Sequence, residues 1–447
     1  MSKKKKVTGR EYRHKRRVRN VILSYLLLIV ILAGIGTGGF FGYKAIVGAI
    51  DQKKAEIAAA EAELQAAAEA EKIAELEAIV EEEPVEEEPE EPEYTEEDLL
   101  NEVVLSCISD MTLEDKVAGL FIVTPEQLTG ADKVIKAGDG TKEALEKYPV
   151  GGMIYFAQNI QSEDQFTEML ANTVSYSKYP IFLGVDEELG DINRIRSAFK
   201  LDAMKSAKEL GDAGDANLTY ESYKTIGEYL TSYGINLDFA PVADLTIEGV
   251  DSAAIGDRSF GTDVDLTSNL VASSVEGVQE MGVTACIKHF PGHGSVEADT
   301  HKGLATTART ADEFKENDIK VFQAGIDAGA KMVMVGHFAA PELTGEESLP
   351  CSLSKAVMTE LLRGECQYDG VIITDAMNMT AISEYYGADE AAVKAIKAGA
   401  DMILMPEDFE LAYNAVLDAV KDGTISEQRI NDSLARVYRI KYKSAVE

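Results

Sequence analysis

A short segment rich in glycine and proline gathers three of the five histidines of this 447-residue chain. It reads Lys288-His289-Phe-Pro-Gly-His293-Gly-Ser-Val-Glu-Ala-Asp299-Thr-His301 and follows an apolar run. Loops that leave strands often carry binding and catalytic residues. Two kinds of chemistry suit these residues. His293, Asp299 and His301 could bind zinc through imidazole and carboxylate groups. Alternatively, Asp299 could orient and charge-stabilise His301 for proton transfer near neutral pH.

The elements that must position these residues are eight short, nearly continuous apolar runs. Such runs are typical of parallel strands that are buried on both faces. They cover residues 118–123, 150–156, 180–186, 236–244, 282–290, 330–338, 369–377 and 400–406. Between them lie amphipathic stretches that predict helices, such as 163–177, 269–281, 311–328 and 354–363. Eight strand–helix units predict an α/β fold, a (β/α)8 TIM-type barrel, with an open doubly wound sheet as the alternative.

Polar residues stand at or just beyond the C-terminal ends of five of these runs. They are Asp186, Asp244, His289, His337 and Asp375. Barrel enzymes assemble their sites at this end of the strands. One such residue could be accidental, but five together predict a site.

At this point the chain resembles a known family. The run KHFPGHG at 288–294, with D-x-H after it, is similar to the signature of the β-N-acetylglucosaminidases of glycoside hydrolase family 3. Further segments agree in the same order over roughly residues 105–445. They are DEELG at 186–190, NLDFAPVADL at 236–245, IGDRSFG at 255–261 and DGVIITDAMNM at 369–379.

The resemblance implies a covalent mechanism that retains the anomeric configuration. It makes Asp375 the nucleophile and His301 the acid/base, with Asp299 as the partner of His301. A retaining hydrolase needs a carboxylate nucleophile and a separate acid/base group, so the residues are compatible with these roles. An imidazole, with an ordinary pKa of about 6.5, can donate and later accept a proton without strong tuning. The family implies no metal and no cofactor.

The resemblance also implies a first sugar subsite. Asp186, Arg258, Lys288 and His289 would hold the hydroxyl groups of the sugar, and Arg194 matches a further position of the motif. The implied substrate is a terminal β-linked N-acetylglucosamine, in glycans derived from peptidoglycan. About forty residues follow the last strand, too few for the second domain of the related glucosidases, and this favours the N-acetylglucosaminidase branch.

Three positions depart from the usual motifs of the family. The common D-Q-E-G-G reads D-E-E-L-G here, so Glu187 replaces a glutamine and Leu189 a glycine. The residue after the nucleophile is Ala376 rather than a second aspartate. Loss of a glycine from a substrate loop is expected to narrow or reshape the first subsite. These departures bear on substrate preference more than on activity.

The N-terminal part predicts a membrane anchor. Residues 1–20 hold ten Lys/Arg, and residues 21–43 carry no charge. A helix of that length reaches roughly 34 Å, enough to cross a bilayer. The excess of basic residues before the span predicts a cytoplasmic N-terminus and an extracytoplasmic remainder, at the cell membrane. A signal peptide cleaved near residues 47–49 is the alternative, but its apolar region would be unusually long.

The expected domains are a basic tail (1–20), a transmembrane helix (21–43), an Ala/Glu-rich helical stalk with an acidic proline-containing linker (44–96), and the catalytic barrel (97–447). Gly34, Gly38 and Gly42 repeat at four-residue spacing, which would let two spans pack as a dimer. The chain has a net charge of −35, with its basic block confined to the tail, so nucleic acid is not an expected partner. The four cysteines predict no clear disulfide.

The leading interpretation is therefore a membrane-anchored, exo-acting β-N-acetylglucosaminidase. A metal-dependent hydrolase that uses the His/Asp cluster is the second interpretation. A non-catalytic glycan-binding or scaffold protein, suggested by the altered DEELG loop, is the third. Whether water or phosphate accepts the glycosyl group stays open.

Overall fold

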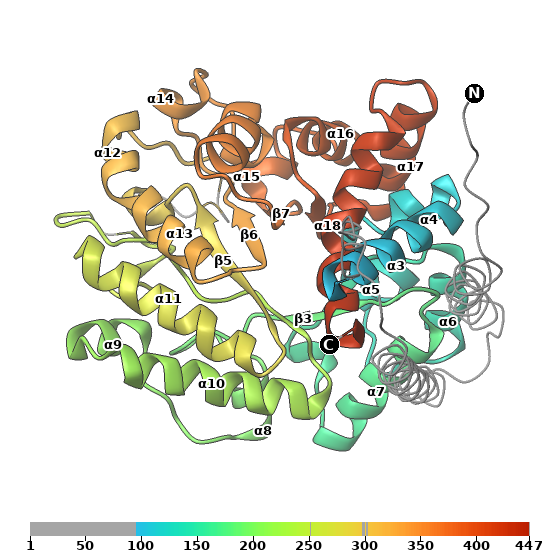
Figure 1. Ribbon diagram of the computed structural model, residues 1–447, viewed down its shortest axis with the longest axis horizontal. Coiled ribbons are helices and arrows are strands. Elements are labelled where there is room, and N and C mark those ends of the chain that lie inside the picture. Colours follow the sequence, from blue (N-terminus) through green and yellow to red (C-terminus); the bar gives the residue numbers. More distant parts are fainter. Residues whose placement is uncertain (1–94, 251, 297–299, 301–302, 447) are drawn as a thin grey trace, which may run out of the picture. The chain divides into compact units, whose positions relative to one another are not determined.

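The computed structural model describes residues 95–250, 252–296, 300 and 303–446 (Figure 1). The expected tail, span and nearly all of the stalk lie outside these residues, as do Asp299 and His301. No described helix is both long and apolar enough to cross a membrane. The chain divides into two units, Met1–Val103 with Ala445–Glu447, and Val104–Ser444. Of the first unit, residues 95–103 and 445–446 are described, and helix α3 (Glu96–Asp110) starts there.

Eight parallel strands form a closed barrel in the order β1 to β8, with β8 pairing with β1. Each strand falls within one of the eight apolar runs, so the predicted barrel is confirmed. The strands are β1 (Phe121–Val123), β2 (Gly152–Ile154), β3 (Phe182–Val185), β4 (Leu237–Asp238), β5 (Thr284–Phe290), β6 (Met332–Val335), β7 (Val371–Ala376) and β8 (Met402–Leu404).

The barrel interior is filled by apolar side chains from the strands, among them Ile122, Phe182, Leu237 and Ile373. Val437, from the long helix α18 (Glu427–Val446), packs into the same cluster. The outer faces of the strands are also buried, because helices surround them (Figure 1). Burial on both faces explains why the runs are continuously apolar rather than alternating.

The remaining helices lie between consecutive strands, except α4, which precedes β1, and α17, which follows β8. They are α4 (Leu113–Ala118), α5 (Pro125–Thr129), α6 (Asp139–Lys147), α7 (Glu163–Tyr176), α8 (Ile195–Phe199), α9 (Ala207–Ala213), α10 (Ala216–Tyr233), α11 (Val264–Glu280), α12 (Ala311–Glu316), α13 (Asp318–Asp327), α14 (Pro341–Thr344), α15 (Thr380–Ser383), α16 (Ala388–Ala398) and α17 (Phe409–Lys421), with a π-helix over Ala356–Glu365. Side-chain caps begin several of them: Ser162 accepts from the N–H of Gln165 at α7, and Asp215 caps α10.

Two elements differ from the predicted boundaries. The helix expected over 311–328 is interrupted at Asn317, where α12 ends and α13 begins with the buried Asp318. The fourth run, 236–244, contains only the two-residue strand β4, and Pro241 later in the run has no N–H to donate to a neighbouring strand. Beyond β4 the run still exchanges backbone hydrogen bonds with β5, and Val242 forms an isolated bridge with Lys288.

Candidate active site

The C-terminal end of the barrel brings a lysine of β5 together with two acidic residues of the segment that follows β3. Asp186 follows β3 directly, and Lys288 lies in β5, where its peptide bond to His289 is cis. The Nζ atom of Lys288 donates to Asp186 Oδ1 at 2.9 Å, and it also lies 2.7 Å from Glu188 Oε1. Lys288 is buried, yet these two carboxylates keep the pKa of its ammonium group above the ordinary value against the effect of burial.

Arg194 and Arg258 approach the same place from loops. An Nη atom of Arg194 lies 3.4 Å from Asp186 Oδ2. Arg258 donates two hydrogen bonds to Glu188, through Nε at 2.8 Å and Nη2 at 2.7 Å. This bidentate geometry is the strong form of the arginine–carboxylate pair. The structure thus brings four predicted sugar-binding residues, Asp186, Arg194, Arg258 and Lys288, into one charged network.

Glu188 is the centre of this network, and sequence reasoning gave it no role. It is 3% exposed. Burial alone would raise the pKa of its carboxyl, but the charges of Lys288 and Arg258 lower it to about 2. Glu188 therefore stays ionised and fixes the directions of both cations. Its position within the DEELG motif, two residues after Asp186, is the sequence feature that could have indicated a role in the site.

Glu187, the first departure from the common motif, shapes the loop after β3. Its carboxylate accepts from the backbone N–H groups of Arg194, Ile195 and Arg196, at 2.7 to 2.9 Å, and from the hydroxyl of Tyr229 at 2.8 Å. The amide of a glutamine has only one acceptor oxygen, so it could not satisfy all of these donors. Glu187 is fully buried and holds the loop that carries Arg194.

Leu189, the second departure, is 2% exposed and therefore belongs to the packed interior. The following residue, Gly190, has φ of +84°, and its carbonyl accepts from the side chains of Asn193 and Arg196. The packed side chain of Leu189 and the hydrogen bonds to the Gly190 carbonyl therefore stabilise the loop. That Leu189 alters the choice of sugar stays a prediction.

Asp244 organises the histidine-rich segment. Its Oδ2 lies 2.7 Å from Nδ1 of His289 and accepts from the His289 N–H at 3.1 Å, and its Oδ1 accepts from the His293 N–H at 2.6 Å. Although burial would raise the pKa of Asp244, His289 and His293 lower it. The Asp244 contact fixes the ring orientation of His289, which was predicted to bind the sugar.

Asp375, the predicted nucleophile, lies near the end of β7. It is half-buried, and its Oδ1 accepts from the N–H of Ala376 at 2.7 Å. Burial alone would raise the pKa of its carboxyl, but His337, His289, the Ala376 N–H and Lys288 lower it to about 2. Asp375 is therefore ionised at neutral pH, as a carboxylate nucleophile must be.

His337 supports the end of β7. Its Nε2 lies 3.0 Å from the carbonyl oxygen of Ala376, and its Nδ1 lies 2.6 Å from the hydroxyl of Ser352. Burial lowers the pKa of its imidazole, and the nearby carboxylate of Asp375 acts in the opposite direction. The two nitrogen contacts make His337 a support of the Asp375 segment.

The predicted acid/base pair, His301 and Asp299, lies outside the described residues, so these roles stay predictions. Thr300, which stands between them in the sequence, is described and buried. Its hydroxyl lies 3.2 Å from Nε2 of His293. Within the described part of the chain, no group of three or more His, Cys, Asp or Glu residues is placed to hold a metal ion. The four cysteines are free and buried.

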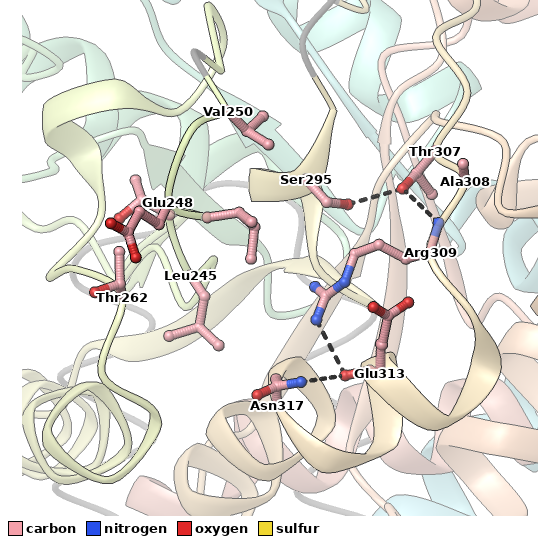
Figure 2. A pocket seen from close by; sticks show the side chains of 12 residues that line it. Leu245, Glu248, Val250, Thr262, Ser295, Thr307, Ala308, Arg309, Glu313 and Asn317 are labelled. Carbon is pink, nitrogen blue, oxygen red and sulfur yellow. Dashed lines mark hydrogen bonds between the residues drawn. The ribbon is translucent and has the colours of Figure 1, made fainter.

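A separate cavity of about 630 Å³ lies between the segment after β4 and the segment that leads into α12. Leu245, Glu248 and Val250 stand on one side of it, and Ser295, Thr307 and Arg309 on the other (Figure 2). The hydroxyl groups of Ser295 and Thr307 lie 3.0 Å apart. The predicted sugar-binding residues and Asp375 do not line this cavity.

Comparisons with known proteins agree with this arrangement. The model of the glycosyl hydrolase family 3 N-terminal domain matches residues 112–440. β-Hexosaminidase LpqI of Mycobacterium tuberculosis is 33% identical over 341 residues, which are 73% of this chain and 82% of that protein. β-Hexosaminidase A of Pseudoalteromonas piscicida is 30% identical over 328 residues, 67% of this chain, and the match spans only 54% of that longer protein.

A solved structure is similar as well. A family 3 β-N-acetylglucosaminidase from Paenibacillus sp. str. FPU-7 matches with a TM-score of 0.70 and 35% identity, over 75% of this chain and 63% of that one. These likenesses confirm the resemblance seen in the motifs, and they support the predicted glycosidase of the β-N-acetylhexosaminidase type. With a described barrel of the right topology and a family model that matches most of the chain, the protein belongs to glycosyl hydrolase family 3.

Proposed function

We propose that this chain is a retaining exo-β-N-acetylglucosaminidase that removes terminal β-linked N-acetylglucosamine from glycans derived from peptidoglycan. The observation that carries the proposal is Asp375, an ionised carboxylate at the end of β7, at the same end of the barrel as the charged network of Asp186, Lys288 and Arg258. Relatives named β-hexosaminidase and β-N-acetylglucosaminidase support the choice of sugar.

The reaction then follows in two steps. In the first, a carboxylate oxygen of Asp375 attacks the anomeric carbon while His301 donates a proton to the leaving oxygen, which gives a covalent glycosyl-enzyme. In the second, His301 takes a proton from water, the water oxygen attacks the same carbon, and the Asp375 carboxylate leaves. Asp299 stabilises the protonated form of His301, and the charged network holds the hydroxyl groups of the sugar.

The direct test compares two substrates on the full-length chain in detergent, an aryl β-N-acetylglucosaminide and an aryl β-glucoside. We expect release of the aryl group from the first, abolished by Asp375→Ala and strongly reduced by His301→Ala. Sugar binding without turnover of either substrate would instead favour a glycan-binding protein. Loss of activity with a chelator, restored by zinc, would favour the metal-dependent alternative. A rate that does not depend on inorganic phosphate identifies water as the acceptor.

We further propose that residues 21–43 anchor the enzyme in the cell membrane and that residues 44–96 carry the barrel outward to the cell wall. The uncharged span, the basic residues before it and the acidic linker support this arrangement. Protease added to intact cells should digest the barrel while a tag before residue 1 stays protected. Cross-linking of the span, lost on Gly38→Ile, would test the dimer that the glycine spacing favours.

A further inference from the structure

Asp238 is a buried acid for which the proposed reaction has no use. It lies in β4, between Val185 of β3 and Ala285 of β5, and it is completely buried. Its Oδ1 accepts from the backbone N–H of Glu187 at 2.9 Å, and its Oδ2 has no hydrogen-bond partner among the described residues. The N–H of Glu187 is therefore the only hydrogen-bond donor to this carboxyl group in the described structure.

This one hydrogen bond fixes the start of the DEELG loop. β3 ends at Val185, and two residues later the N–H of Glu187 donates to the side chain of Asp238. The N–H belongs to the peptide bond that joins Asp186 to Glu187. Asp186 and Glu188, which stand on either side of Glu187, are the carboxylates that bind the buried lysine of the charged network. The side chain of Asp238 thus restrains the backbone between these two carboxylates.

Asp238 shares its surroundings with a second buried carboxyl group, that of Glu187. The carboxylate of Glu187 accepts from three backbone N–H groups and from the hydroxyl of Tyr229. Hydrogen bonds to the charged form of a carboxyl group stabilise that form, so Glu187 is equipped to hold a negative charge, whereas Asp238 has a single donor. An unpaired charge in the interior costs far more free energy than an unpaired hydroxyl. The geometry therefore favours a neutral Asp238.

The other charged and titratable groups around Asp238 act in both directions. Burial is the largest cause that raises the pKa of its carboxyl group, and the charges of Glu187 and Asp186 raise it further. The Glu187 N–H and the charge of Lys288 act in the opposite direction, yet the pKa stays well above the ordinary value. Three further groups lie close enough to interact with Asp238, and their raised pKa values keep them neutral: Tyr223 and Tyr229 of α10 and Cys286 of β5.

We propose that Asp238 is a positioning residue that acts as a neutral carboxylic acid, whose oxygen holds the N–H of Glu187 and so fixes the loop of Asp186 and Glu188. This role rests on the proposed function, in which the loop and its cations hold the sugar. Glu187 stands where the common motif has glutamine, so it adds a negative charge beside Asp238. A neutral Asp238 lets the loop accept that charge without burying a second one.

Infrared spectroscopy of the full-length chain in detergent tests the charge state. A neutral carboxylic acid has a carbonyl stretching band that an ionised carboxylate lacks. At neutral pH we expect Asp238→Asn to lose one such band. Asp244→Asn is the matched control and should lose none, because Asp244 is an equally buried aspartate of the same run whose pKa His289 and His293 lower against the effect of burial. An unchanged band in Asp238→Asn would overturn the neutral state.

Stability against pH gives a second readout of the same charge. The unfolded chain releases the proton of an aspartate near pH 4, whereas a folded chain with a raised pKa keeps it. The unfolding equilibrium constant of the unaltered chain, divided by that of Asp238→Asn, should therefore rise about tenfold per pH unit between about pH 5 and 7. With Asp244→Asn the same ratio should stay constant, because Asp244 is ionised in both states. A constant ratio for Asp238→Asn would mean that Asp238 is ionised in the fold.

The positioning role is tested by KM on an aryl β-N-acetylglucosaminide. Asp238→Leu is similar in size but offers no acceptor to the Glu187 N–H, so we expect KM to rise by about tenfold with a smaller change in kcat. Asp238→Asn keeps the acceptor oxygen without a charge and should bring KM back to within about twofold of the unaltered chain. A loss of stability alone would lower the amount of active enzyme and leave KM unchanged. Equal KM values for all three chains would overturn the positioning role.

Failure of this role can be told apart from failure of the proposed function. If the unaltered chain cleaves no β-N-acetylglucosaminide, the proposed function fails, while the infrared and unfolding measurements still decide the charge of Asp238. The positioning role is then read from the Kd of N-acetylglucosamine for the same chains, measured by calorimetry. If the unaltered chain is active but Asp238→Asn raises KM as much as Asp238→Leu, only the role of Asp238 fails. Asp238→Ala gives the same comparison if Asp238→Leu does not fold.

Discussion

Two buried carboxylates, one at each end of the barrel, are surrounded by cations in similar ways. At the C-terminal end, Glu188 binds Arg258 and Lys288. At the N-terminal end, Asp401 precedes β8 and contacts three arginines on two helices, namely Arg363, Arg429 and Arg436. The arginines of the two clusters are alike in exposure, with 20 to 26% of each side chain exposed. The presence of buried acidic groups and the exposure of the arginines therefore do not tell the two clusters apart.

What differs is the kind of element that each cluster joins. Asp401 also accepts from the N–H of Ile372 and from the hydroxyl of Ser433, so it ties β7, β8 and α18 together. The cluster around Glu188 joins loops that follow strands, and its neighbour Asp186 keeps 18% of its side chain exposed. The Asp401 cluster stabilises the fold, whereas the Glu188 cluster places charged groups at the end of the barrel where barrel enzymes bind ligands. The end of the barrel at which a charged cluster lies, rather than the number of its charges, therefore indicates whether the cluster serves function.

The sharpest test of this contrast is Asp375→Asn. Removal of the nucleophile should lower kcat by about ten-thousandfold or more, because the covalent step is lost. The free energy of unfolding should fall by much less than the barrier to catalysis rises, since the described hydrogen bond of the carboxylate is to the N–H of its own neighbour. Steady-state kinetics and denaturant unfolding would check both. A large loss of stability would mean that the catalytic end also supports the fold.

Asp401→Asn should do the reverse. Removing the charge from a buried pair typically costs about 3–5 kcal/mol of stability, because the arginines lose their counter-charge. Activity per folded molecule should stay unchanged. Asp369→Asn is the control, since Asp369 pairs with the same Arg436 but is 92% exposed, and such a contact is worth about 1 kcal/mol at most. A fall in kcat with Asp401→Asn would show that the cluster at the N-terminal end also affects catalysis, which would contradict the separate roles of the two clusters.

Glu188→Gln should act on binding. Loss of the negative charge frees Arg258 and Lys288 to turn toward other acceptors, so KM is expected to rise by about ten- to a hundredfold, with a smaller change in kcat.

The same variant, Glu188→Gln, tests how the free energy of unfolding depends on pH. The pKa of Glu188 is lowered in the folded state, so its contribution is present above the unfolded value near 4 and is lost as the pH falls toward 2. The variant should flatten that acid limb of the unfolding curve.

Glu187→Gln, which restores the common residue of the motif, should have a moderate effect. The glutamine can accept through one oxygen only, so at least one buried N–H loses its partner, at about 1–2 kcal/mol. The temperature of unfolding should fall, and Leu189→Gly can be combined with it to test whether the two departures compensate each other. Equal stability of the glutamine variant would show that the loop rearranges without cost.

The smallest effect is expected when the pH is lowered, because protonation of Asp375 should not contribute to the pH dependence of kcat/KM. With a pKa of about 2, Asp375 stays ionised throughout the range from pH 4 to 8, so it contributes no titration to kcat/KM there. Any acid limb above pH 4 must then come from another group. The profile of His301→Ala against that of the unaltered chain would show whether the limb belongs to His301.

Much of this arrangement can be predicted from the sequence, for a physical reason. Strands buried on both faces appear as continuous apolar runs, and parallel strands bring their ends to one edge, so Asp186, His289 and Asp375 were found by position alone. The break at Asn317 was not predicted, because the amphipathic pattern of 311–328 continues through it. The positions of Asp299 and His301 stay predictions.

The charge pairs could not be predicted. Glu188 meets Arg258 across 70 positions of sequence, and Arg363 meets Asp401 across 38. Such pairings depend on how loops and helices cross, about which local periodicity carries no information. The contact between His293 and Thr300 is close in sequence, yet it depends on how the loop folds, where Asp244 accepts from the backbone N–H of His293 and Phe338 packs against the His293 ring.

Helix α18 has a consequence for experiments on shortened chains. Val437 fills the bottom of the barrel interior, and Lys441 donates to the carbonyl of Gly151, just before β2, at 2.7 Å. The barrel interior can therefore be completely packed only after the ribosome has released this C-terminal helix. A chain truncated before the helix would expose apolar residues that favour aggregation. Such a truncation removes none of the candidate site residues. Inactivity of a truncated protein would accordingly report a failure to fold, and it would say nothing about catalysis.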